Sequence, residues 1–192
     1  MTTLYGQRIR LRAAERSDLP LFTTWLADPQ VTENLMVNQP MSLASEEIWF
    51  ENMLKRPARE QVLVIEALQA SDEPREAPRY VPIGNTSFNA VEEPALAAEI
   101  GIFIGEKTYW NRGFGTETMG VMLRHGFENL NFHRIWLRVF APNLRAIRAY
   151  EKAGFTYEGK FREGHYQHGS YVDVLIMSVL RQEWDLAQTQ KG

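Results

Sequence analysis

An apolar stretch of eight residues, Ala97 to Ile104 (AAEIGIFI), is interrupted by one charge only. A strand of this length and composition is expected to lie in the centre of a sheet with both faces buried. A turn with two glycines follows it and leads into a helix. The apolar positions of this helix recur at intervals of three and four residues, namely Met119, Met122, Leu123, Phe127 and Leu130. A central sheet with helices packed on it is therefore expected.

Strand and helix signals continue on both sides of this unit. Further strands are expected at 8–12, 61–68, 81–89, 134–140, 156–162 and 171–180. A helix is expected to begin after Ser17, which is its predicted N-cap. Further helices are expected within 29–38, from residue 42 or 45 to Pro57, and over 143–153. The polar segment 69–79 is expected to be a solvated loop, and His168-Gly169 a turn. Without a linker or repeat, residues 1–192 are expected to form one mixed α/β domain.

The charge balance and the missing cysteines narrow the possible functions. Because 21 Lys and Arg stand against 24 Asp and Glu, the net charge is −3, which argues against a dedicated nucleic-acid or membrane-surface binder. Zero cysteines exclude disulfides and thiolate nucleophiles, and four scattered histidines predict no metal site. No segment approaches the roughly 18 consecutive apolar residues of a membrane span, and no apolar leader begins the chain. A soluble cytoplasmic protein is expected.

The glycine turn is a candidate anion site. Arg112-Gly113-Phe114-Gly115-Thr116 precedes a helix start, where unpaired backbone N–H groups and the helix dipole favour a phosphate or pyrophosphate. Glycines allow close approach of the backbone, and Thr116 and Arg112 add a hydroxyl and a positive charge. The alternative is that the glycines only form a tight turn. The spacing matches neither a P-loop nor a dinucleotide fingerprint.

A second candidate lies in the helix at 143–153. Asn143 and Tyr150 are seven residues apart, so two helical turns place them on about the same face, roughly 10 Å apart along the axis. The amide could bind amide groups of a long ligand, and the phenol could give a proton to a leaving group. The alternatives are an N-cap role for Asn143 and a core position for Tyr150.

With these motifs the chain resembles the GNAT superfamily of acetyl-CoA-dependent N-acetyltransferases, in particular the branch of Rim-type ribosomal-protein N-terminal acetyltransferases and spermidine acetyltransferases. The resemblance covers nearly the whole chain, from RIRLRAAERSDLP through AEIGIFIGEKTYWNRGFGTETM to NLRAIRAYEKAGFTYEGKFREGHYQHGSYVDVLIMSVLRQEW. It implies a mostly antiparallel, twisted sheet of about seven strands flanked by about four helices. It also implies a V-shaped split between the strands 97–104 and 134–140, with acetyl-CoA bound in the opening.

The resemblance assigns roles to individual residues. Backbone groups near Phe103 and Ile104 would hold the pantetheine and thioester, Asn143 would contact the pantetheine, and Tyr150 would stand near the sulfur. The pyrophosphate would lie on Arg112, Gly113, Phe114, Gly115 and Thr116. Among the arginines gathered around these segments (Arg112, Arg134, Arg138, Arg145 and Arg148), Arg112 and Arg148 are the expected contacts.

Three positions depart from the family pattern. Trp110 replaces a Gln or Arg that often precedes the first glycine, so one side-chain contact is lost there while the backbone donors remain. Ala146 replaces a serine whose hydroxyl can be catalytic in the ribosomal branch, which leaves Tyr150 as the better acid. His165 replaces a glutamate that can act as base in the same branch. This difference weakens the inference that the substrate is a ribosomal protein, as it is in that branch.

Acetyl transfer to an amine needs a base, because amines are mostly protonated at neutral pH. Glu99 and His165 are the candidates for this base, and Glu33 is a third. Alternatively, Glu99 is a solvated residue at the end of a strand, and His165 is a surface residue of the hairpin. Apolar residues of the early helices could line an acceptor cleft or belong to the core: Phe22, Trp25, Trp49, Phe50 and Met53.

The expected function is therefore transfer of the acetyl group of acetyl-CoA to a primary amine by direct attack in a ternary complex. The amine would belong to a small molecule or a peptide: a protein N-terminus, a polyamine, an amino acid or an amine antibiotic. The alternatives are a non-catalytic acyl-CoA-binding sensor and a general phosphate-binding module. The resemblance also implies a homodimer.

Overall fold

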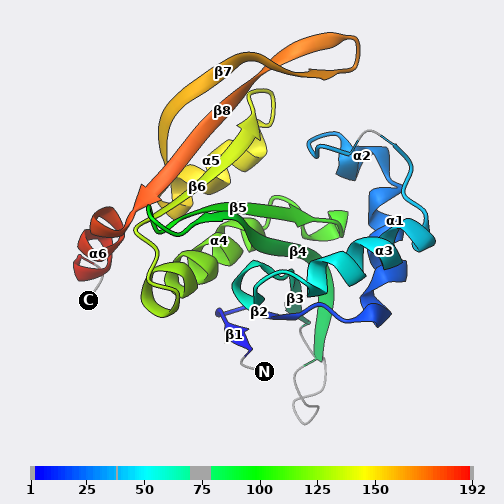
Figure 1. The fold of residues 1–192 in the computed structure, drawn as a ribbon, viewed down its shortest axis with the longest axis horizontal. Coiled ribbons are helices and arrows are strands. Elements are labelled where there is room, and N and C mark those ends of the chain that lie inside the picture. The colour runs from blue at the N-terminus through cyan, green and yellow to red at the C-terminus, as the bar shows by residue number, and fades with distance from the viewer. Residues whose placement is uncertain (1–2, 38, 70–78, 191–192) are drawn as a thin grey trace.

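The computed structural model describes residues 3–37, 39–69 and 79–190, and its strands form one twisted sheet (Figure 1). The described part contains eight strands: β1 (Leu4–Tyr5), β2 (Ile9–Ala13), β3 (Leu63–Gln69), β4 (Arg79–Glu92), β5 (Ala97–Ile104), β6 (Arg134–Phe140), β7 (Thr156–Gln167) and β8 (Ser170–Leu180). Their order in the sheet is β1-β2-β3-β4-β5-β6-β8-β7. All neighbours are antiparallel except β5 and β6.

Helices cover both faces of this sheet. Over the described residues they are α1 (Leu19–Leu26), α2 (Pro29–Thr32), α3 (Leu43–Leu54), α4 (Phe114–Arg124), α5 (Leu144–Ala153) and α6 (Arg181–Thr189). Val64 and Ile65 are neighbours in β3 and so point to opposite faces. Val64 packs in a buried cluster with residues of α1 and α3, whereas Ile65 packs in another cluster with residues of α4. Helices α1 and α3 therefore lie on one face and α4 on the other.

The parallel pair β5 and β6 opens into a fork. Only Ala97, Ala98 and Glu99 pair with β6, and their partners are Arg134, Ile135 and Trp136. Beyond Glu99, β5 continues along β4 while β6 continues along β8. This is the split that the resemblance implies, and its apex lies at Glu99.

The hairpin of β7 and β8 projects from the rest of the molecule (Figure 1). Its turn, at the expected His168-Gly169, has φ values of 49° and 81°. The hairpin carries exposed aromatic side chains along its length, namely Tyr157, Phe161, Tyr166 and Tyr171. Because β7 ends the sheet order, one of its edges has no neighbouring strand in the described sheet.

Two expectations for the N-terminal region need correction. Ser17 is not the N-cap of the first helix: residues 16–18 form a short 3₁₀ turn, and α1 begins at Leu19, with Pro20 in its first turn as expected. The buried Asp18 takes the position before the helix, and its carboxylate binds the guanidinium of Arg12.

The sheet also gains a short first strand, and the described helices exceed the expected four. Between Gln69 and Arg79, the predicted loop lies outside the described residues.

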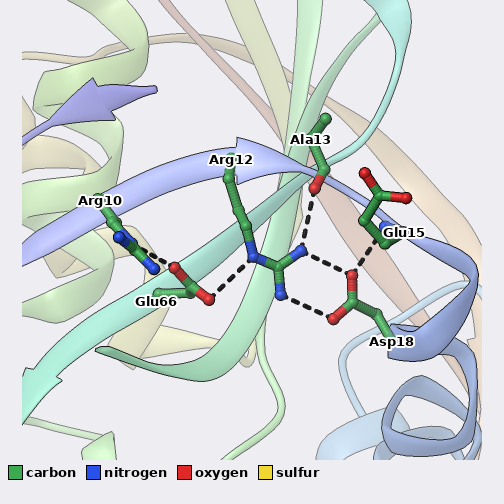
Figure 2. A network of polar contacts seen from close by, with 6 residues as sticks. All are labelled: Arg10, Arg12, Ala13, Glu15, Asp18 and Glu66. Carbon is green, nitrogen blue, oxygen red and sulfur yellow. Dashed lines mark hydrogen bonds and ion pairs between the residues drawn. The ribbon is translucent and has the colours of Figure 1, made fainter. Parts of the chain in front are cut away.

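Arg12 is part of a charge network that joins β2, β3 and the start of α1 (Figure 2). Both oxygens of the buried Glu66 accept hydrogen bonds, from Nε of Arg10 at 2.5 Å and Nε of Arg12 at 2.9 Å. Both oxygens of Asp18 accept bonds of 2.8 Å from the two terminal nitrogens of Arg12. The hydrogen bond to Asp18 is the main cause that raises the pKa of Arg12 further above its ordinary value. The network fixes α1 against the sheet.

Candidate active site

A cavity of about 520 Å³ occupies the fork between β5 and β6. Its walls are the second half of β5, the end of β6, the start of α4, one side of α5 and the segment after α2. The lining residues are 31, 34–36, 85, 87, 99–104, 109–111, 113–116, 138–140, 143, 145, 146, 148–150 and 152. The cavity is large enough for an extended ligand that enters between the two diverging strands.

The second half of β5 borders this cavity, so the expectation of burial on both faces is wrong there. Ala97 and Ala98 are buried, whereas residues 101–104 are only half-buried. Every second residue of a strand directs its N–H and C=O groups toward one neighbouring strand. Since β6 pairs only as far as Glu99, the β6-facing N–H and C=O of Ile102 and the N–H of Ile104 lack a ladder partner, while the carbonyl of Ile104 accepts from the indole of Trp110. These groups can bind a ligand backbone.

The glycine turn forms the start of α4. Gly113 is the N-cap residue with φ of 84°, a left-handed conformation that favours glycine. The first N–H groups of α4, those of residues 114–116, have no partner within the helix. A Cβ built on Gly115 would meet nothing within 4 Å, so this position is open toward the cavity it lines. The arrangement can hold an anion at the helix N-terminus.

Arg8 positions this turn, a role that the sequence did not indicate. Its Nη1 donates to the carbonyl of Arg112 at 3.0 Å, and its Nε donates to Glu117 at 2.9 Å. The hydroxyl of Thr116 donates to the carbonyl of Ala149 at 3.4 Å and so links α4 to α5. The expected extra hydroxyl of the anion site is therefore engaged between the two helices.

Asn143 and Tyr150 both line the cavity from α5. The N-cap alternative is confirmed for Asn143, because its Oδ1 accepts a bond of 3.2 Å from the backbone N–H of Ala146. Tyr150 packs against Phe155 with ring centroids 5.9 Å apart, and it is partly buried against the core cluster that contains the α4 residues. Burial raises the pKa of its phenol to about 12, a shift that Arg145 opposes. The phenol therefore stays protonated at neutral pH and can donate a proton.

Cationic side chains surround the α5 side of the cavity. The guanidinium of Arg145 lies 3.8 Å from the ring centroid of Trp110, a cation–π contact. Burial lowers the pKa of Arg145, and Glu33 partly offsets this. The indole Nε1 of Trp110 donates to the carbonyl of Ile104 at 2.8 Å. Trp110, which departs from the family pattern, thus joins the cavity wall to Arg145.

Glu99 lies at the apex of the fork as one half of an ion pair. Its two oxygens accept from Nε and Nη2 of Arg138 at 2.8 and 3.1 Å. The side chain of Glu99 is 15% exposed and that of Arg138 39% exposed, and both residues line the cavity. The solvated strand-end alternative for Glu99 is therefore wrong.

Three of the predicted site residues do not line the cavity. Arg112 donates to the carbonyl of Thr108 at 3.3 Å and lies over the Tyr109 ring. His165 stacks on Phe140 with ring centroids 4.3 Å apart, and Phe140 lines the cavity whereas His165 does not. Glu33 is exposed, and its charge acts on Arg145. The early aromatic residues form a core cluster under α1 and α3 rather than an acceptor cleft.

Sequence reasoning missed Asn85 and Ser87 of β4, which line the cavity beside β5. It also missed Leu35 and Met36 after α2, and Lys152 at the end of α5. The available signal was weak: Asn85, Ser87 and Asn89 are polar and two residues apart, which places them on one face of a strand, but Thr86 between them is also polar.

The chain has clear relatives among known proteins. Residues 8–156 match the family model of the acetyltransferase (GNAT) domain. The uncharacterized N-acetyltransferase p20 of Bacillus licheniformis is 29% identical over 186 residues, which cover 96% of this chain and 99% of that protein. The L-amino acid N-acetyltransferase AaaT of Escherichia coli K12 is 29% identical over 173 residues, 88% of this chain and 96% of that protein.

A solved structure shares the fold. The spermidine N-acetyltransferase from Vibrio cholerae, solved in complex with CoA and spermine, superposes with a TM-score of 0.81 at 24% identity. The match covers 93% of this chain and 99% of that chain. It supports the mixed sheet and the helices described above.

Proposed function

Because the chain belongs to the GNAT family of acetyltransferases, we propose that it transfers the acetyl group of acetyl-CoA to a primary amine by direct attack in a ternary complex. N-acetyl transfer is the activity named for the relatives p20 and AaaT. One observation carries the proposal for the site: a single cavity at the fork brings together a helix N-terminus, the phenol of Tyr150 and the carboxylate of Glu99.

The described residues fit CoA. The N-terminus of α4 with Gly113 to Thr116 offers backbone donors for a pyrophosphate, and the exposed Arg148 adds positive charge beside it. The β6-facing groups of Ile102 and the N–H of Ile104, which pair with no strand, offer donors and an acceptor to the amide groups of a pantetheine arm. Asn143 lines the same path, and Phe103 and Ile104 lie along it. Arg112 is proposed to act only through its place in the turn.

Acetyl-CoA would supply the acetyl group and a thiol leaving group. The amine nitrogen forms a bond to the acetyl carbon while the carbon–sulfur bond breaks, and the sulfur leaves as a thiol once it receives a proton. Tyr150 is the proposed donor, because its phenol is protonated and lines the fork. Backbone N–H groups at the end of β5 are the proposed donors to the carbonyl oxygen.

Glu99 is the proposed acceptor of the amine proton. It lies in the cavity, whereas His165 is stacked outside the lining. The carboxylate binds the incoming ammonium, and the proton passes through it to water. The acetylated nitrogen gives up its second proton to solvent and Tyr150 recovers one, so the net products are an acetamide, free CoA and one proton.

A cytoplasmic homodimer of one 1–192 domain is also part of the proposal. Exposed aromatic side chains on the β7–β8 hairpin support a contact with a second copy. Among the described residues, no helix is long and apolar enough to cross a bilayer. Light scattering after gel filtration measures the assembly: a mass of one chain would remove the dimer from the proposal.

The first experiment follows thiol release from acetyl-CoA with peptides, spermidine, free amino acids and aminoglycosides, beside calorimetric titration of CoA. Turnover with one acceptor class is expected. CoA binding without turnover on this panel would favour the sensor, and no CoA binding would overturn the proposal.

A pair of glycine variants tests the position of the cofactor. Gly115→Asp places a carboxylate at the proposed pyrophosphate site and should lower CoA affinity at least about 100-fold through like-charge repulsion. An acidic residue in the first turn suits the helix dipole, so folding should be retained. Gly120→Asp is the control, because Gly120 lies in the same helix, has equal room for a Cβ and does not line the cavity. Equal loss of affinity in both variants would contradict the assignment.

A further inference from the structure

The cavity has an excess of positive charge. Among its described lining residues, Glu99 is the single acid, while Arg138, Arg145, Arg148 and Lys152 are bases. A polyamine carries several positive charges and needs several carboxylates to replace its hydration. The one carboxylate available is already paired with Arg138. Because Arg145, Arg148 and Lys152 lie on α5, beside the proposed cofactor, the apex of the fork holds this ion pair, whose charges sum to zero and give a polycation little counter-charge.

The pair of Glu99 and Arg138 lies on the face of the sheet away from α4. Ala98 and Ile100 of β5 pack in the cluster that contains the α4 residues, so Glu99 and Gly101 point to the opposite face. Trp136 is the partner of Glu99, and Arg138 follows two residues later on the same face of β6. An acceptor can reach the fork from this face while CoA lies along α4 and α5.

Arg138 uses only one edge of its guanidinium in this pair. Its Nε and Nη2 bind the two oxygens of Glu99, which leaves the N–H groups of Nη1 for another acceptor. Each oxygen of Glu99 keeps a second lone pair. An ion pair with free positions on both partners can bind a molecule that carries an ammonium and a carboxylate close together, with opposite charges facing each other.

The neighbouring surface is small and polar. Gly101 has no side chain, and a Cβ built there would lie 3.3 Å from Nδ2 of Asn89. The hydroxyl of Ser87 donates to Oδ1 of Asn89 at 3.3 Å, which directs the amide nitrogen of Asn89 toward Gly101. Together with Asn85, these groups form a hydrogen-bonding floor beside the ion pair.

We infer that the acceptor is a free α-amino acid, whose ammonium binds Glu99 and whose carboxylate binds Arg138. This inference rests on the proposed acetyl transfer and names its substrate class. The carboxylate fixes the amino group at the apex of the fork, where β5 and β6 separate. Arg138 is thus the residue that selects acceptors with a carboxylate beside the amine.

The test compares acceptors that differ only in the carboxylate. Each L-amino acid is assayed beside its amide and its decarboxylated amine, with spermidine and short peptides in the same series. At least one amino acid should show a kcat/KM about 10- to 100-fold above that of its amide, as expected for one charge-assisted hydrogen-bonded contact. Acetylation of spermidine or peptides at equal or higher kcat/KM would overturn the inference and leave the proposed function standing.

Arg138→Gln separates recognition from a structural role. It should remove the preference for the amino acid over its amide, mainly by raising KM for the amino acid, with CoA affinity unchanged. A purely structural role would lower kcat/KM for both acceptors equally and keep their ratio, which would also overturn the inference. Arg134→Gln is the matched control, since Arg134 lies on the same strand, pairs with Glu158 and does not line the cavity. Absence of CoA binding in the wild type would instead refute the proposed function itself.

Discussion

The network of Figure 2 and the cavity at the fork contain the same kinds of charged side chain but balance them differently. In the network, every oxygen of Glu66 and Asp18 accepts a hydrogen bond from an arginine of β2. In the cavity, the described lining has four cations and one carboxylate. The charges of the first region are paired within the chain, whereas the second has more cations than carboxylates and is the proposed binding site for ligands.

This difference separates stability from activity. Desolvated charges whose partners are all present hold elements together, and removing one partner leaves the other buried and unpaired. Charges without an internal partner keep donors available for binding at some cost in self-repulsion. Changes in the network should therefore lower the free energy of unfolding, and changes in the cavity should lower turnover or ligand affinity.

The largest effect is expected for Glu66→Gln, which breaks the complete region. The amide nitrogen of glutamine would face the donors of Arg10 or Arg12, and both guanidinium groups would lose their counter-charge. The free energy of unfolding should fall by about 3 kcal/mol. Urea unfolding followed by circular dichroism measures this.

Glu51→Gln is the control for that loss. Glu51 pairs with Arg16, and both side chains are more than half exposed, at 53% and 56%. The change in the free energy of unfolding should stay within about 0.5 kcal/mol. If both variants lose the same amount, the buried network has no special role in stability.

Tyr150→Phe is the corresponding change in the cavity. Loss of the proposed proton donor should lower kcat about 100-fold, while CoA affinity and the free energy of unfolding change little. Steady-state rates and calorimetry give the three quantities. Tyr157→Phe is the control, because Tyr157 is exposed on the hairpin and should keep full turnover. Unchanged kcat in Tyr150→Phe would remove Tyr150 as the acid.

The raised pKa of Tyr150 predicts a stability effect at alkaline pH. The pKa is about 12 in the folded protein against 10.0 ordinarily, so the folded state holds the proton more tightly than the unfolded state does. The contribution is present below pH 10 and is lost as the pH rises from 10 to 12, by about 2 kcal/mol. Tyr150→Phe should therefore lose less stability than wild type over this range. Parallel curves for the two proteins would contradict the prediction.

The smallest effect concerns Glu158, which forms an ion pair with Arg134 that is more exposed than the network of Figure 2. Hydrogen bonding to Arg134, aided by Ser178, lowers its pKa from 4.5 to about 2. Its contribution to stability is present above pH 4.5 and is lost as the pH falls from about 5 to 2. Because the Glu158 side chain is 36% exposed, solvent screening keeps this below about 1 kcal/mol. Glu158→Gln should flatten this part of the acid unfolding curve, whereas an unchanged curve would speak against the pair.

Local patterns were sufficient for the centre of the fold. The expected strands 97–104 and 134–140 match β5 and β6 residue for residue, because their apolar runs are bounded by clear turn signals. The helix after Asn143 begins with the expected cap and ends at Gly154, whose φ is 105°. Each of these features depends on residues adjacent in sequence, which is why a sequence can show them.

Long-range pairing explains the rest. Asp18 binds Arg12 and displaces Ser17 as the cap, and Glu99 binds Arg138 across 39 residues of chain. The strand β7 extends past the expected end at 162 to Gln167, because backbone pairing with β8 continues where both faces are exposed and no apolar alternation exists. His165 lies outside the cavity because it stacks on Phe140, a residue of another strand. Arg112 is held by the carbonyl of Thr108 only four residues away, a contact that depends on the shape of the turn between them.

The short parallel contact between β5 and β6 also has a mechanical consequence. Three residue pairs join the N-terminal half-sheet to the C-terminal one, whereas seven pairs join β6 to β8. A force that pulls the halves apart meets those three pairs and the shared packing beneath them. A ligand that spans the fork contacts both halves of the sheet at once, so the protein with bound ligand should be more rigid than the free protein. The added rigidity should arise where β5 and β6 pair.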